Sequence, residues 1–156
     1  FETRKDAESN RAMLEIAETF LAGENYDSAI KFYDRLNRLE QLDDQDRAIV
    51  HYKRGLAHFR RAVATLQDEE NAGRLNEGTQ VITQEPQFDK TARADFAKVK
   101  EILRGYSTLF PNSSYVPETH YLLALAFFAF KSSINRTLNS VIPLRSWNNS
   151  FLFSKY

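Results

Sequence analysis

The chain contains no cysteine. A disulfide framework, a thiolate metal site and a cysteine nucleophile are therefore excluded. Glycine and proline are also scarce, with five and four residues in a chain of 156. Tight turns between short strands depend on these two residue types, so their scarcity disfavours an all-β fold.

Long hydrophobic runs and an excess of one charge are missing as well. The longest uncharged apolar run, Tyr121 to Phe130, spans ten residues. A helix that crosses a bilayer needs about 20 apolar residues, so the sequence predicts no transmembrane segment. The 21 Lys and Arg residues balance 21 Asp and Glu residues. Nucleic-acid-binding domains normally carry a net basic charge, so no nucleic-acid partner is expected.

Apolar residues recur at helical spacing along most of the chain, which predicts an all-α fold. Short turns between successive helices indicate that they pair as helical hairpins. A further short apolar stripe reaches Ile142, and Pro143 ends it. The spacing predicts helices over about 5–22, 26–41, 44–66, 89–110 and 117–130.

Composition divides the chain into segments. Residues 1–66 are expected to hold the first helical repeats, and residues 89–142 a later repeat. Between them, residues 67–88 contain an acidic run, two glycines and a proline, with few large apolar side chains. This insertion is predicted to be either a long loop or a loosely helical segment. Residues 143–156 form an aromatic tail without a clean period.

The aromatic tail carries five large apolar side chains within ten residues, too many for a solvated coil. Two arrangements stay open: the tail covers the last hairpin of its own chain, or it docks on a partner chain. Docking on a partner is favoured, because one short tail offers little area to a helix that is apolar on every face. The tail residues proposed to bind a partner are Trp147, Phe151 and Phe153.

Clusters of polar side chains give no sign of an enzyme, a metal site or a cofactor. His51 and His58 lie seven residues apart, whereas metal-binding pairs on a helix need a spacing of about four. Asp43, Asp44 and Asp46 are expected to cap a helix, because the glycine and terminal glutamate of a calcium loop are missing. No serine lies in a nucleophile elbow, and no glycine-rich phosphate loop follows a strand.

One predicted helix carries a run of basic residues without any acidic residue among them. These side chains can bind phosphate or the acidic surface of a partner. They can equally form a solvated helix face that pairs with carboxylates of the preceding hairpin, and both interpretations stay open. The residues are Lys53, Arg54, Arg60 and Arg61.

Residues 1–43 resemble a tetratricopeptide repeat, a helix–turn–helix unit of about 34 residues. When the unit is counted from Asn10, its small residue is Ala17, and Phe20 follows on the same helix. The second helix then has Tyr26, Ala29 and Tyr33 in signature positions.

Two further units follow the same pattern. The second begins near Ala48 with Gly55 as its small residue, and the third has Ala124 as its small residue with Phe127 after it. In repeats of this class, small side chains let paired helices approach closely, and aromatic side chains fill the space between units. The expected fold is a tetratricopeptide-like solenoid of helical hairpins with one irregular insertion.

Several sequence segments, which follow one another in a fixed order, indicate a particular family among proteins with such repeats. They are YKRGL at 52–56, the acidic insertion, TARADF at 91–96 and LFPNSSY at 109–115. This ordered set resembles the outer-membrane assembly lipoprotein BamD family. The resemblance implies a non-enzymatic scaffold at the periplasmic face of an outer membrane, which binds protein subunits of the β-barrel assembly machinery. It also implies a lipid anchor upstream of Phe1 and no cofactor. The alternative is a tetratricopeptide adaptor in another complex, such as a secretion, motility or organellar machine.

A solenoid of this kind binds its partners on a concave face that the first helix of each unit lines. Aromatic anchors supply most of the affinity, and charged rim residues supply specificity. The helical register predicts these partner-binding residues on that face: Leu14, Glu18, Leu21, Tyr52, Phe59, Arg60, Tyr121, Leu125 and Phe128.

Overall fold

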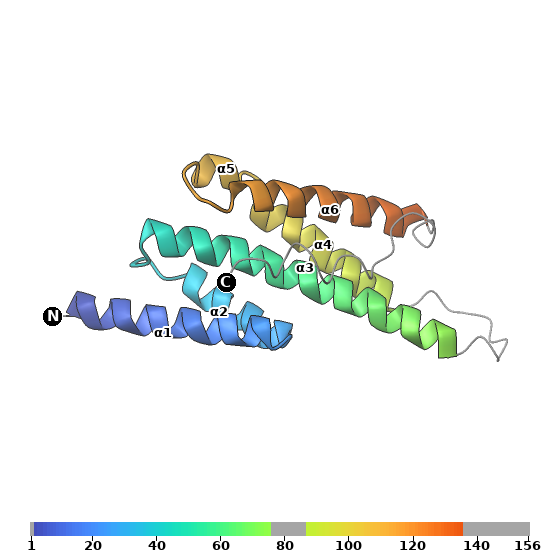
Figure 1. Ribbon diagram of the computed structural model, residues 1–156, viewed down its shortest axis with the longest axis horizontal. Helices are drawn as coiled ribbons and strands as arrows, with labels where there is room; N and C mark the ends of the chain where they lie inside the picture. Colours follow the sequence, from blue (N-terminus) through green and yellow to red (C-terminus); the bar gives the residue numbers. More distant parts are fainter. Residues whose placement is uncertain (1, 76–86, 136–156) are drawn as a thin grey trace.

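The computed structural model describes residues 2–75 and 87–135, and Figure 1 shows that they form a stack of helices. The prediction of an all-α fold is confirmed, since no strand occurs in these two ranges. The aromatic tail at 143–156 lies outside the described residues. The helices are α1 (Glu2–Ala22), α2 (Tyr26–Asn37), α3 (Asp44–Leu75), α4 (Gln87–Leu103), α5 (Tyr106–Leu109) and α6 (Val116–Asn135).

Side-chain caps explain where two of the helices begin. Asn25 precedes α2, and its side-chain oxygen accepts a hydrogen bond from the Ser28 backbone N–H at 3.2 Å. Asp43 precedes α3, and its Oδ1 accepts from the Asp46 N–H at 2.7 Å. Each cap satisfies one of the backbone donors that a helix start leaves free. The capping role predicted for the aspartates is therefore confirmed for Asp43, whereas Asp44 and Asp46 lie in the first turn of α3.

Two helix boundaries differ from the prediction. Helix α3 continues to Leu75, so the helical interpretation of the insertion holds for residues 67–75, whereas 76–86 lie outside the described residues. The single helix expected over 89–110 is wrong, because α4 ends at Leu103 and the short α5 follows it. Gly105 breaks the helix there with φ = 81°, a left-handed conformation that glycine adopts at little cost.

Successive helices pack on one another as a zigzag. Helix α1 packs on α2, α2 on α3, α3 on α4, and both α3 and α4 contact α6. Figure 1 shows α1 and α2 along one edge, α3 in the middle and α6 along the opposite edge. Helix α3 is therefore the central element, and α6 ends the described stack.

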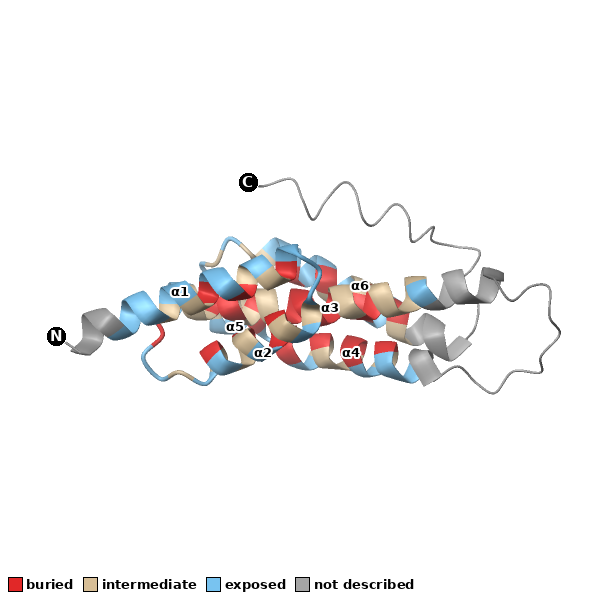
Figure 2. Ribbon diagram, turned by 90° about the horizontal axis from the view of Figure 1, so that it is seen from below, coloured by how far each residue is buried: buried red, intermediate tan, exposed pale blue. Residues whose placement is uncertain are grey.

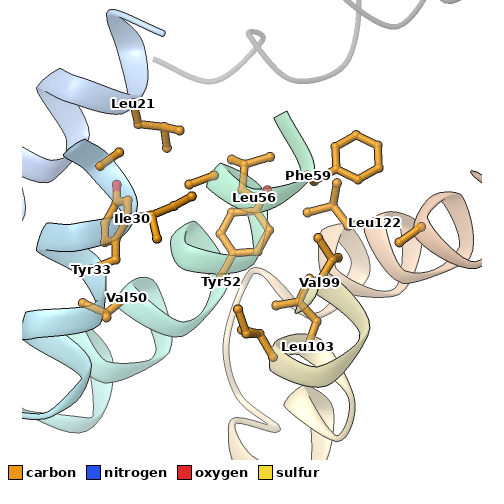
Figure 3. Packing of buried hydrophobic residues seen from close by; sticks show 14 of the residues in the cluster. Leu21, Ile30, Tyr33, Val50, Tyr52, Leu56, Phe59, Val99, Leu103 and Leu122 are labelled. Atoms are coloured by element: carbon orange, nitrogen blue, oxygen red, sulfur yellow. The ribbon is translucent and has the colours of Figure 1, made fainter. Parts of the chain in front are cut away.

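The hydrophobic core lies on both sides of α3. Figure 3 shows Tyr52 and Leu56 of α3 between Ile30 of α2 on one side and Leu103 and Leu122, from α4 and α6, on the other. Full burial of such an aliphatic side chain stabilises a fold by about 1.5–3 kcal/mol. The core is therefore continuous from the first hairpin to α6.

Exposure varies strongly along the stack. Figure 2 shows buried residues concentrated in the middle, whereas residues 6–12 of α1 are mostly exposed. Among residues 2–75 and 87–135, no helix combines the length and the apolar character that crossing a bilayer requires.

Candidate functional site

Two of the segments that carry the family resemblance stack on one another, and the third packs on α3 nearby. Tyr52 of the YKRGL segment stacks on Tyr115 of the LFPNSSY segment, with ring centroids 4.5 Å apart and planes inclined by 16°. Phe59 of α3 meets Phe96 of the TARADF segment edge to face at 5.7 Å. Burial raises the pKa of Tyr52 to about 12, so its phenol stays neutral. These segments therefore form a structural junction between α3, α4 and the start of α6.

Ser113 ties the loop before α6 to this junction. The Tyr106 hydroxyl donates to the Ala48 carbonyl at 3.0 Å, so the Ser113 hydroxyl 2.8 Å away donates to the Tyr106 oxygen. The Ser113 oxygen also accepts from the Tyr115 N–H at 3.2 Å. A side chain of the loop thus fixes both the ring of α5 and the residue that stacks on α3.

Ser113→Ala should lower the melting temperature by about 2–4 °C. The change removes hydrogen bonds worth about 1 kcal/mol, and a chain of this size loses a few degrees for each kcal/mol. Thermal unfolding followed by circular dichroism measures the effect. Ser114→Ala is the matched control, because Ser114 is exposed, and its melting temperature should not change. Equal melting temperatures for both variants would contradict the role given to Ser113.

His51 also has a packing role. Its Nε2–H donates to the Ile102 carbonyl at 2.6 Å, which joins α3 to α4. Burial lowers the pKa of His51, although the hydrogen bond to Ile102 opposes that shift. The ring lies 5.6 Å from that of Phe110. These contacts hold the His51 ring between α3 and the segment from α4 to the loop before α6.

A polar cluster around the buried side chains of Asp95 and His58 connects α2, α3 and α4. Asp95 of α4 is 3% exposed, and it receives a bidentate contact from Arg61 through Nε at 2.8 Å and Nη2 at 2.7 Å. His58 donates from Nδ1 to the same carboxylate at 2.7 Å. Arg61 also donates to Asp27 of α2. We call these four residues the ion cluster.

The ion cluster is arranged to hold helices together. Burial alone would raise the pKa of Asp95, but hydrogen bonds from His58 and Arg61 outweigh it, and the pKa is lowered. The hydrogen bond from Arg61 to Asp95 in turn raises the pKa of the guanidinium. Both charges are therefore fixed by partners inside the fold. Within the described ranges, no group of three or more His, Cys, Asp or Glu side chains can hold a metal ion.

The basic residues of α3 pair with carboxylates of the preceding hairpin. Lys53 lies 3.6 Å from Glu18 of α1, and Arg54 lies 2.6 Å from Asp34 of α2. The Arg54 contact is an ion pair without hydrogen-bond alignment at Nε. Of the two interpretations that the sequence left open, intramolecular pairing is thus confirmed for these two residues, and the Arg61 contact to the first hairpin adds a third.

Several predicted partner-binding residues are core residues instead. Leu14 and Leu21 of α1 are 9% and 4% exposed, and Tyr52 and Phe59 of α3 are 5% and 2% exposed. The apolar face of each first helix packs against its neighbours, so these side chains offer no surface to a partner. Assigning them to a binding face was wrong, because the register identifies an apolar face but not what covers it.

The remaining predicted residues are at the surface or only half-buried. Tyr121 and Phe128 of α6 are 53% and 43% exposed, and Leu125 between them is half-buried. Their spacing places them on one stripe of the helix, which we call the aromatic edge. Glu18 and Arg60 are half-buried, and both have partners inside the fold. Trp147, Phe151 and Phe153 lie outside the described residues.

The small residue predicted for the third unit is not covered. Ala124 is exposed, and Phe127 is 55% exposed. The buried small residues of α6 are Ala126 and Ala129, which face the rest of the stack. The apolar stripe that would pair with α6 continues beyond Asn135, outside the described residues, so the placement of Ala124 between paired helices stays a prediction.

Together, the described elements define an all-α protein of packed helical hairpins, whose buried polar groups join one helix to another. In comparisons with known proteins, no protein family, curated protein or solved structure matches this chain. The geometry of the chain itself is therefore the basis for a functional proposal.

Proposed function

We propose that the chain is a non-enzymatic, tetratricopeptide-like scaffold that binds protein partners through the aromatic edge of α6. The observation that carries the proposal is the exposure of Tyr121 and Phe128 on one side of the same helix. Aromatic side chains are enriched in the centres of protein interfaces, where a few of them supply most of the binding energy. Leu125 completes an apolar stripe that a partner segment can cover.

The contacts that the titratable groups make support a function in binding rather than in catalysis. The ion cluster and His51 are engaged in contacts between helices, and their charges or tautomers are set by those contacts. A general acid or base has to reach a substrate proton within hydrogen-bond distance. These groups bond to neighbouring helices, so their geometry suits a structural role.

The narrower proposal is a periplasmic subunit of the outer-membrane β-barrel assembly machinery. It rests on the resemblance to the BamD family, and the stacking of Tyr52 on Tyr115, which joins two of the segments that carry this resemblance, supports it. The proposal includes a lipid anchor upstream of the chain and partners among the other subunits. A tetratricopeptide adaptor in a different multiprotein complex is the second candidate, because an exposed aromatic stripe would serve it equally well.

Binding to the periplasmic domain of the barrel-forming assembly subunit tests the proposal. Tyr121→Asp and Phe128→Asp should each weaken binding by about 30-fold, the effect expected for loss of an interface hot spot of about 2 kcal/mol. Isothermal titration calorimetry measures the dissociation constant. Ile16→Asp is the matched control, because Ile16 is 45% exposed but lies on α1, and it should bind like the parent protein.

The outcomes separate the two levels of the proposal. If the parent protein binds and the two aspartate variants bind equally well, the aromatic edge is not the binding surface. No binding to the barrel-forming subunit would contradict the assembly function, and the adaptor would become the better hypothesis.

A further inference from the structure

In the first hairpin, the small residue of α1 and the aromatic residue after it are covered by the second helix. Ala17 has no exposed surface, and its register neighbour Phe20 stacks on Phe32 of α2 with ring centroids 5.5 Å apart. Cover by α2 therefore removes this apolar strip from water.

In the second hairpin, α4 covers the equivalent position of α3. Gly55 is buried, and a Cβ atom added there would lie 2.6 Å from the side chain of Leu103. Such a distance shows that α4 approaches α3 as closely as a glycine allows. The same register position is thus covered in both of the first two hairpins.

On α6, the equivalent position has no cover within the described residues. Ala124 and Phe127 are exposed together with His120, and the three share one stripe of the helix, which we call the end face. At about 100° of rotation per residue, Phe127 and Tyr121 point about 120° apart, so the end face and the aromatic edge are different sides of α6. Lys100 of α4 lies 5.1 Å from the Phe127 ring and leaves it more than half exposed.

We infer that residues 144–156 of the same chain dock on the end face of α6 and take the place that a second helix takes in the earlier hairpins. This segment contains Trp147, Phe151 and Phe153. One of these rings can stack on Phe127 in the way that Phe32 stacks on Phe20. The inference does not depend on the proposed function, because the end face and the aromatic edge are different sides of α6.

The length of the connecting chain fits this arrangement. Residue Ala124 lies about 16 Å along the helix from its end at Asn135, since each helical residue adds about 1.5 Å. Residues 136–143 can span about 26 Å when extended, so the tail reaches Ala124 and beyond. A segment held by a linker this short has an effective concentration of about the mM range. A separate partner must compete with the tethered segment at that concentration. Covalent proximity therefore favours the tail over the partner docking that the sequence suggested.

The single tryptophan of the chain reports directly on the position of the tail. Trp147 should show blue-shifted emission and protection from acrylamide in the full chain, because docking removes it from water. Ala124→Arg should shift the emission to the red and increase quenching, since a long charged side chain would stand in the end face. Ile16→Arg is the matched control, at an exposed apolar position of α1, and it should leave the emission unchanged.

Other outcomes would overturn the inference. A solvent-exposed Trp147 in the parent chain would show that the tail is not docked. A protected Trp147 that Ala124→Arg does not expose would place the tail elsewhere. Protection that disappears on dilution, as a dimer dissociates in light scattering, would assign the end face to the tail of a second copy. Circular dichroism verifies that each variant keeps the helical content of the parent.

Discussion

Asp95→Asn should lower the free energy of unfolding by about 1.5–3 kcal/mol, the usual worth of hydrogen bonds to a charged group, because Arg61 is 31% exposed and keeps its contact to Asp27. The amide can accept fewer hydrogen bonds than the carboxylate, and it has no charge to oppose that of Arg61. With Asp95 only 3% exposed, water cannot replace the lost interactions. Urea unfolding at pH 7 measures the difference.

Acid should remove the same stabilisation from the parent protein. The pKa of Asp95 is lowered below its ordinary value of 3.8 in the fold, so the unfolded chain binds the proton first. The contribution of Asp95 is therefore complete above that ordinary value and is lost as the pH falls through the pKa of the folded state. The free energies of the parent protein and of Asp95→Asn should converge in this acidic range.

A surface ion pair provides the comparison for Asp95. Asp34→Asn breaks the contact to Arg54, but the Asp34 side chain is 35% exposed, so the loss should stay below about 1 kcal/mol. If the two asparagine variants were equally stable at pH 7, the ion cluster would contribute no more to the free energy of unfolding than a surface ion pair does.

Gly55→Leu should destabilise the protein by about 1–3 kcal/mol through overpacking at the contact between α3 and α4. Even a Cβ atom at this position lies within 3 Å of three atoms of Leu103, whose side chain is fully buried and has little room to move. The melting temperature should fall by about 2–4 °C for each kcal/mol.

A double-mutant cycle identifies the cause of this effect. Leu103→Ala removes the atoms in the way, so the double variant should be more stable than the sum of the two single changes predicts. Ala94→Leu, at an exposed position of α4, should cost little by comparison. Strict additivity would mean that Gly55 does not act through Leu103.

The sequence predicted the helices well where apolar periodicity is strong and less well where it is weak. The caps at Asn25 and Asp43 follow from local chemistry that neighbouring residues contain. The extension of α3 to Leu75 was only one of two open interpretations, because residues 67–75 are mostly polar and have no apolar stripe to favour a helix over a loop. The break at Gly105 depends on a backbone angle that a lone glycine permits but does not require.

The candidate site was harder to predict, because burial depends on distant parts of the chain. Leu14 and Phe128 both lie on apolar stripes, yet packing covers the first and leaves the second exposed. The ion cluster joins His58 to Asp95, 37 residues further along. The only local sign was a pair of basic side chains, His58 and Arg61, one turn apart on a helix whose other residues there are mainly apolar. Nothing in the sequence identifies the carboxylate that meets them.

The zigzag packing of the helices has a consequence for how the protein folds. Because each helix contacts mainly helices adjacent in the chain, few long loops must close, and folding should be fast, in the microsecond to millisecond range. During synthesis, α1 and α2 can pair before α4 has been translated, since chains emerge at about 5–20 residues per second. The ion cluster cannot form until Asp95 of α4 has been synthesised. Its contacts therefore form late and join α4 to a first hairpin that can already be folded.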